Sequence, residues 1–164
     1  MLKKVKIKIL TDRSDAPVGL FENKAGPLCE ADAPEHSEMS VEGRYHDDGT
    51  RVAISYDESE LSGMEGSRTT ISFQKAEPGV VTMLRTGSVK TALLFEQGRR
   101  HECVYQTPLA PFDVCVQTNA VKNAIETMGT LDLDYIVELK GAQAERTKMR
   151  ILISAVYNKP LGMG

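Results

Sequence analysis

The feature that most constrains this chain is the alternation of apolar and polar residues with a period of two. In residues 4–9 lysine alternates with valine and isoleucine, and in residues 131–139 leucine, tyrosine and valine alternate with acidic residues, with Ile136 as the one break. A period of two is typical of a β-strand with one face in a core and the other in water. Helical spacing is scarce in the chain, so the sequence predicts an all-β fold.

Turn residues divide the chain between these two segments into short runs about ten residues apart, as in barrels and sandwiches. Asp48-Gly49 is the strongest hairpin signal, and Pro78-Gly79 fits the two central positions of a type II turn. Residues 120–128 are compatible with a strand extension or with a turn of helix. The expected strands lie near residues 3–11, 36–46, 50–58, 67–75, 80–86, 89–96, 100–107, 112–120, 130–140 and 145–156.

Strands joined by tight turns pair with their neighbours in sequence, and a long meander closes most simply into a barrel, which removes the exposed edges. We therefore expect a single antiparallel up-and-down barrel of about eight to ten strands, in one domain spanning residues 1–164. Residues 12–35, rich in Pro, Gly and Asp, form a long loop insertion in this scheme, either disordered or a flap over one barrel end. Residues 158–164 are expected to be a frayed tail.

The charge balance argues against a nucleic-acid partner, because 20 basic residues face 23 acidic ones and the net charge is −3, whereas nucleic-acid binding requires a basic excess on one face. The chain has no apolar run near the length of a membrane span, about 18 residues. Its N-terminal segment lacks the apolar region of a secretion signal. We therefore expect a soluble, cytoplasmic protein that binds no membrane and in which Cys29, Cys103 and Cys115 are free thiols.

The sequence offers no convincing catalytic or metal-binding pattern. Its histidines and cysteines lack the spacing of metal ligands, so neither a metal nor another cofactor is expected. His101 and Cys103 can share one strand face, but a cysteine in a strand is more often a small core residue than a nucleophile. Asp57 and Glu58 point to opposite faces of a strand and do not form an acid pair. The protein is therefore not expected to be an enzyme.

Several motifs between residues 54 and 118 resemble those of the YwiB-like family, bacterial proteins of unknown function. The motifs are a Tyr-acid-acid stretch, Gly-x-Glu-Gly with paired threonines, Arg-x-Gly, Phe-x-x-Gly and Tyr-x-Thr-Pro with an aromatic residue after it. They correspond to Tyr56, Asp57, Glu58, Gly63, Glu65, Gly66, Thr69, Thr70, Arg85, Gly87, Phe95, Gly98, Tyr105, Thr107, Pro108 and Phe112. The resemblance covers about residues 40–156 and implies a lipocalin-like (calycin) barrel but no catalytic residue, and a fold does not define a function. The 12–35 insertion departs from the family pattern.

The stretch 84–108 looks like a basic patch, but alternation separates its charges. Lys90, Arg99 and Arg100 are expected in solvent or beside a turn, whereas Arg85 falls among inward-pointing residues. A buried arginine needs a partner, and we expect Glu58 to pair with it as a bidentate fork. The polar residues expected to point inward are the candidate ligand-binding residues, namely Arg85, Tyr105, Tyr56, Glu58, His101, Thr118 and Tyr135.

Two functions fit this set of side chains. In the first, the protein is a non-enzymatic small-molecule binder that holds an apolar or amphipathic ligand inside the barrel with Arg85 at its polar end. An anionic ligand is one form of this hypothesis. In the second, Arg85 and Glu58 plug one end of a self-filled barrel, and the protein acts as a structural or interaction module through its outer surface or the 12–35 loop. The sequence leaves the identity of a ligand and the oligomeric state open.

Overall fold

The computed structural model describes residues 2–16, 35–58, 65–139 and 143–155, and within them it confirms the all-β prediction. The described residues form ten strands and one turn of helix: β1 (Leu2–Asp15), β2 (Glu35–Asp47), β3 (Arg51–Asp57), β4 (Ser67–Gln74), β5 (Glu77–Gly87), β6 (Thr91–Glu96), β7 (Arg100–Gln106), β8 (Pro111–Ala124), α1 (Ile125–Met128), β9 (Thr130–Leu139) and β10 (Gln143–Ala155). Within these ranges, no helix has the length and apolarity needed to cross a membrane.

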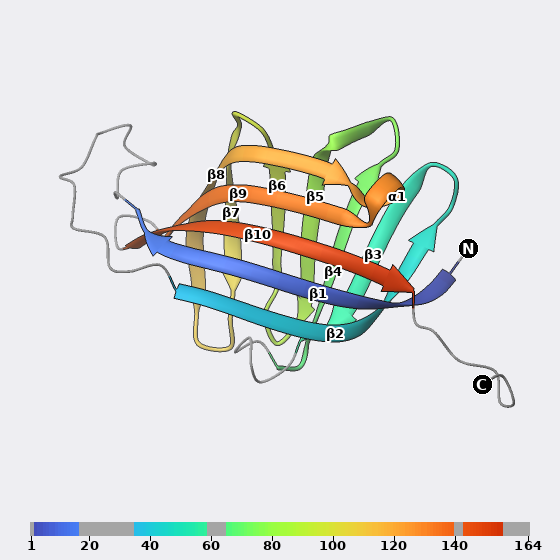
Figure 1. Cartoon of the computed structure of the whole chain (residues 1–164). Coiled ribbons are helices and arrows are strands. Elements are labelled where there is room, and N and C mark those ends of the chain that lie inside the picture. Colours follow the sequence, from blue (N-terminus) through green and yellow to red (C-terminus); the bar gives the residue numbers. More distant parts are fainter. Residues whose placement is uncertain (1, 17–34, 59–64, 140–142, 156–164) are drawn as a thin grey trace, which may run out of the picture.

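The strands form one antiparallel sheet in the order β6-β5-β4-β3-β2-β1-β10-β9-β8-β7. Strands that are neighbours in the sheet are also consecutive in the chain, except that β1 pairs with β10. Figure 1 shows β8, β9, β10, β1 and β2 running across the front of the molecule while β3 to β7 pass behind them. The sheet therefore curls into a nearly closed up-and-down barrel, which confirms the predicted architecture.

The barrel closes between β6 and β7. Although a turn at residues 97–99 joins these strands, the backbone pairing between them in the described chain is one isolated bridge, in which Lys90 and Gln106 exchange two hydrogen bonds of 2.8 Å. At the other end of β7, the backbone of Thr118 in β8 bonds Gly98 and Arg99 instead. The seam between β6 and β7 is thus held at one point rather than along a ladder.

The core lies inside the barrel and follows the alternation. Val5, Ile7 and Ile9 are buried, and the lysines between them remain at least partly exposed. Inside the barrel, the rings of Phe95 in β6 and Tyr135 in β9 meet with centroids 4.6 Å apart and planes inclined by 50°. Because the barrel closes between β6 and β7, strands β6 and β9 are separated by β7 and β8, and the contact between their buried rings joins the two sides of the closure inside the barrel.

Two segments differ from the predicted boundaries. β1 continues to Asp15, so residues 12–15 of the expected loop belong to a strand that pairs with β10 on one side and β2 on the other. Residues 120–128 combine both alternatives, because β8 runs to Ala124 and α1 follows directly. The rest of the expected loop, residues 17–34, and the expected frayed tail, residues 158–164, lie outside the described residues.

The hairpin prediction at Asp48-Gly49 is confirmed. Gly49 has a φ of 92°, and the Asp48 carboxylate accepts hydrogen bonds from the backbone N–H of Thr50 and Arg51 at 2.9 and 2.7 Å. An aspartate followed by glycine suits this geometry because the side chain replaces backbone acceptors and glycine tolerates a positive φ.

The prediction of a type II turn at Pro78-Gly79 is wrong. The chain turns earlier, at residues 75–76, and Gln74 already pairs with Glu77. Pro78 and Gly79 belong to β5, where the register shifts between Ser72 and Gln74 of β4. A proline fits such an irregularity, since its missing N–H interrupts no ladder bond there.

Candidate ligand-binding site

A row of polar side chains crosses the inner wall of the barrel over four strands. Tyr56 in β3 lies opposite Thr69 in β4, Thr69 lies opposite Arg85 in β5, and Arg85 lies opposite Thr91 in β6. Tyr56, Thr69 and Thr91 are buried, and the side chain of Arg85 is only 11% exposed. We call this set the polar row. Lys90, Arg99 and Arg100 are exposed, as predicted.

Glu58 is the partner of Arg85, as predicted, but the contact is looser than the predicted bidentate fork. Arg85 Nε lies 3.8 Å from Glu58 Oε1, and the Glu58 side chain is 1% exposed. The hydroxyl of Thr69 donates a hydrogen bond of 2.5 Å to the same carboxylate oxygen. Arg85 Nε and Glu58 Oε2 are buried without a hydrogen-bond partner among the described residues. The pair balances charge while leaving hydrogen-bonding capacity unused on both sides.

The electrostatics keep two nearby tyrosines protonated. Burial raises the pKa of Tyr56, and the neighbouring Glu58 raises it further while Arg85 opposes the effect. Burial also raises the pKa of Tyr135 in β9, against the opposing influence of Arg85 and Arg13. Both phenols therefore remain neutral hydrogen-bonding groups at physiological pH. Arg85, Arg13 and Tyr135 line the same pocket, which is described next.

A pocket of about 440 Å³ opens at the end of the barrel where β1 ends and β10 begins. Arg13 and Glu145 form an ion pair of 3.7 Å with side chains 47% and 39% exposed, which places them at its rim. The partly exposed Phe112 stands at the mouth. The lining residues are Arg13, Arg85, Leu93, Tyr105, Thr107, Phe112, Val114, Tyr135, Val137, Leu139, Glu145, Thr147 and Met149. We call this cavity the barrel-end pocket.

The structure brings three of the seven candidate residues together in this pocket. Arg85, Tyr105 and Tyr135 line it. Tyr56 and Glu58 lie behind Arg85, on the side of β3 and β4, and are not part of the lining.

The other two candidates lie elsewhere in the interior. His101 pairs in register with Val116 of β8, and Thr118 is fully buried one alternation further along that strand. Both carry a buried polar atom, His101 Nε2 and Thr118 Oγ1, with no hydrogen-bond partner among the described residues. Neither contributes to the pocket wall.

Sequence reasoning missed Arg13, Glu145 and Thr147. Arg13 continues the odd-numbered inward set of Val5, Ile7 and Ile9, but the predicted strand ended at residue 11. Glu145 and Thr147 lie in the predicted last strand, and the alternation of the buried Met149 and Ile151 extends back to both. This alternation, followed to the ends of β1 and β10, would have predicted that all three side chains point inward.

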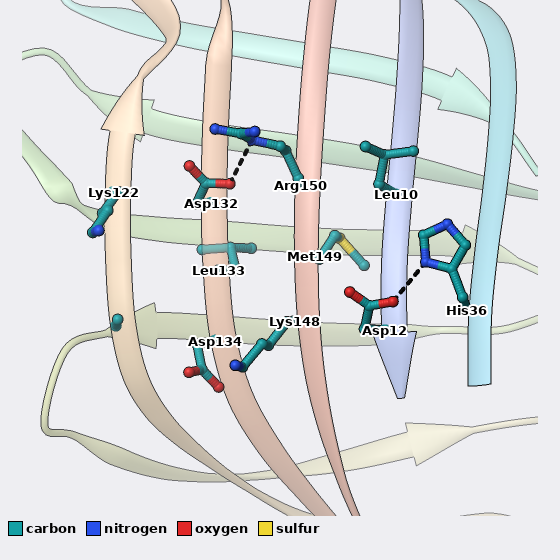
Figure 2. A pocket seen from close by; sticks show the side chains of 11 residues that line it. Leu10, Asp12, His36, Lys122, Asp132, Leu133, Asp134, Lys148, Met149 and Arg150 are labelled. Carbon is teal, nitrogen blue, oxygen red and sulfur yellow. Dashed lines mark hydrogen bonds and ion pairs between the residues drawn. The ribbon is translucent and has the colours of Figure 1, made fainter. Parts of the chain in front are cut away.

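A second hollow of about 410 Å³ lies on the outer face of the sheet, over β8, β9, β10, β1 and β2. Figure 2 shows its polar and charged side chains spread across neighbouring strands, with an ion pair between Arg150 and Asp132 and a hydrogen bond between His36 and Asp12. In register, Lys148 lies between Asp134 and Asp12. Opposite charges that face one another across strands stabilise the pairing and its register. We interpret this surface as a charge ladder of the sheet rather than as a binding site.

Neither of the two described cysteines has the surroundings of a nucleophilic site. Cys103 and Cys115 are free thiols, as predicted, and Cys29 lies outside the described residues. Burial raises the pKa of the Cys103 thiol, with a smaller opposing contribution from Thr91. A raised pKa disfavours the thiolate that nucleophilic catalysis requires.

The fold and the cavity together define the class of protein: an antiparallel up-and-down β-barrel with a pocket at one end. The chain belongs to the family described as "Domain of unknown function (DUF1934)", whose profile matches residues 29–151. The crystal structure of the ywiB protein from Bacillus subtilis is similar, with a TM-score of 0.65 and 13% sequence identity over 94% of each chain. The resemblance to YwiB-like proteins is therefore confirmed, and at this identity the structural likeness establishes the fold alone. No curated protein sequence matches the chain.

Proposed function

We propose that this protein is a non-enzymatic binder of a small amphipathic molecule, which it holds in the barrel-end pocket with Arg85 at the polar end. The observation that carries the proposal is the composition of the pocket. Its wall is mainly aliphatic and aromatic, with the well-buried Arg85, a few hydroxyls and the Arg13–Glu145 ion pair at the rim, and its volume is about 440 Å³. Small-molecule sites are typically concave and apolar with a few placed polar groups, in a range of about 300 to 1,000 Å³.

The arrangement of the wall supports an amphipathic ligand. Leu93, Val114 and Val137 give the apolar part of a ligand a surface from which water is excluded. Arg85 lies among them with 11% of its side chain exposed, so it retains a face for a polar group. Free thiols at Cys103 and Cys115 are consistent with a reducing compartment, and we propose the cytoplasm as the place of action.

One observation favours the alternative, a structural or interaction barrel with a plugged end. Glu58 is almost fully buried, contacts Arg85 and accepts a hydrogen bond from Thr69. A buried charged pair of this kind can serve stability and closure without any ligand. In that case the working surface is the outside of the barrel.

Native mass spectrometry of the protein purified from its own cells distinguishes the two functions. We expect a stoichiometric small molecule on the wild-type protein, retained by Arg99→Ala, an exposed arginine, and lost by Arg85→Ala. A clean unliganded mass would favour the plug, especially if Arg85→Ala lowered the free energy of unfolding by about 3 to 5 kcal/mol, since Glu58 is then buried without its countercharge. That combination would overturn ligand binding as the role of Arg85.

A further inference from the structure

Each arginine of the barrel-end pocket has a carboxylate of the protein against it. Arg85 lies 3.8 Å from Glu58, and Arg13 lies 3.7 Å from Glu145, measured between the nearest nitrogen and oxygen atoms. The charged side chains that line the pocket are these two arginines and Glu145, and Glu58 stands directly behind Arg85. The positive charges of the pocket are therefore balanced by equal negative charge before any ligand arrives.

This balance works against an anionic ligand. A carboxylate bound to Arg85 would be the second carboxylate around one guanidinium, and like charges in a buried site repel each other. Entry into a wall made of Leu93, Val114 and Val137 also removes water from the ligand, which costs several kcal/mol for an unpaired ion. Since Glu58 is 1% exposed, solvent does not screen its charge as it would at the surface.

The same wall suits a neutral group that accepts hydrogen bonds. Arg85 lines the pocket with 11% of its side chain exposed, and its guanidinium carries further N–H donors besides the buried Nε, which is the atom nearest Glu58. Tyr135 lines the pocket beside Thr147, and hydroxyl groups both donate and accept hydrogen bonds. A carbonyl oxygen can accept from the guanidinium while a neighbouring N–H or O–H donates to a hydroxyl.

We propose that the ligand of the barrel-end pocket is a neutral amphipathic molecule with a carboxamide-type head group, whose carbonyl faces Arg85 and whose apolar body lies against the aliphatic wall. The proposal rests on the proposed function and specifies its ligand class. A neutral ligand replaces the anionic ligand that the sequence suggested, because Glu58 already supplies the negative charge that Arg85 requires.

Isothermal titration calorimetry with three probes of one shape tests the head group. The probes are 3-phenylpropanamide, 3-phenylpropanoate and 3-phenylpropylamine, which share a body and differ only in the charge of the head. We expect the wild-type protein to bind the amide at least tenfold more tightly than the carboxylate or the ammonium probe, with an affinity that does not change between low and high salt. Tighter binding of the carboxylate would overturn the neutral head group and leave the proposed function intact.

Glu58→Gln provides a second test, because it removes the internal counter-charge and keeps the size of the side chain. We expect this variant to reverse the preference, so that the carboxylate probe binds more tightly than the amide and its affinity falls with added salt. Asp57→Asn is the matched control: it removes the neighbouring carboxylate, which is 74% exposed, pairs with Arg68 outside the pocket and is screened by solvent, and it should keep the preference for the amide.

The outcomes separate the two levels of the proposal. An unchanged preference in folded Glu58→Gln contradicts the role assigned to the internal counter-charge. If the variant does not fold, the ranking of the three probes by the wild-type protein still decides the head group. Failure of all three probes to bind either protein counts against the barrel-end pocket as a ligand site, and hence against the proposed function itself.

Discussion

At the scale of single residues, Gly43 shows how closely the strands around the polar row approach each other. Gly43 is buried in β2 and lies opposite Val5 of β1. A Cβ atom at this position would collide with the side chain of Ile7, would lie 2.5 Å from the backbone oxygen of Ser55 and would lie 3.3 Å from Tyr56 Cβ. Only a residue without a side chain lets β2 pack here, and the neighbour it accommodates is the first member of the polar row.

Gly43→Ala should therefore destabilise the protein by about 1 to 3 kcal/mol, the usual cost of overpacking a core. Part of the clash is with backbone, which cannot move aside as a side chain can. Gly79→Ala is the control, because nothing lies within 4 Å of its added Cβ, and it should change stability by about 0.5 kcal/mol or less. Urea unfolding curves measure both variants. Equal midpoints for Gly43→Ala and the wild-type protein would contradict the close approach of β2 and β3.

At the scale of elements, the outer face of β9 and β10 is held by an ion pair with well-formed hydrogen bonds. Arg146 donates from Nε to Asp134 Oδ1 at 3.0 Å and from Nη2 to Asp134 Oδ2 at 2.8 Å. Asn119 of β8 adds a longer contact of 3.4 Å to the same carboxylate. These bonds hold the pKa of Asp134 below its ordinary value, with the hydrogen bond from Arg146 as the largest cause and burial opposing it.

Asp134→Asn should lower stability at neutral pH by about 0.5 to 1 kcal/mol, the range for a partly exposed pair. Because the pKa is lower in the folded state, the stabilisation is present above the ordinary value of 3.8 and is lost as the pH falls through the folded-state pKa. The stability difference between variant and wild type should therefore shrink toward zero in acid. Thermal unfolding across a pH series measures it, with Asp113→Asn, an exposed aspartate of β8, as the control for loss of one charge. If the stability difference between Asp134→Asn and the wild-type protein stayed constant down to acidic pH, the ion pair between Asp134 and Arg146 could not be its source.

The elements also show what the sequence can and cannot predict. Alternation located all ten described strands because each has one face in the core and one in solvent. It failed at residues 12–15, which contain no apolar residue and are a strand only because β10 and β2 pair with them. The same failure hid Arg13 from the candidate site. Arg85 and Glu58 were predictable as a pair because burial of one charge requires the other, whereas the cavity beside them depends on how distant side chains fill the barrel.

At the scale of the whole molecule, the barrel has one weak line, the seam between β6 and β7. The single bridge there, Lys90 with Gln106, directly precedes Thr91 of the polar row and directly follows Tyr105 of the barrel-end pocket. The other strands of the barrel are paired along ladders on both sides. Segments with few backbone hydrogen bonds open locally at lower free energy than those in complete ladders. The seam is therefore the place where the barrel opens most easily, and it opens beside the pocket.

Hydrogen exchange measured by mass spectrometry tests this view of the seam. In the unliganded protein, peptides covering residues 91–96 and 100–106 should contain a larger share of fast-exchanging amides than peptides from β4 and β9, which have a partner on each side. A ligand that contacts Arg85 and Tyr105 would join β5 to β7 across the seam, so its binding should slow exchange in these two peptides and leave β4 nearly unchanged. Equal protection of β6, β7, β4 and β9 without ligand would contradict the weak seam. Slowing confined to β4 on ligand binding would mean that the ligand does not bridge β5 and β7.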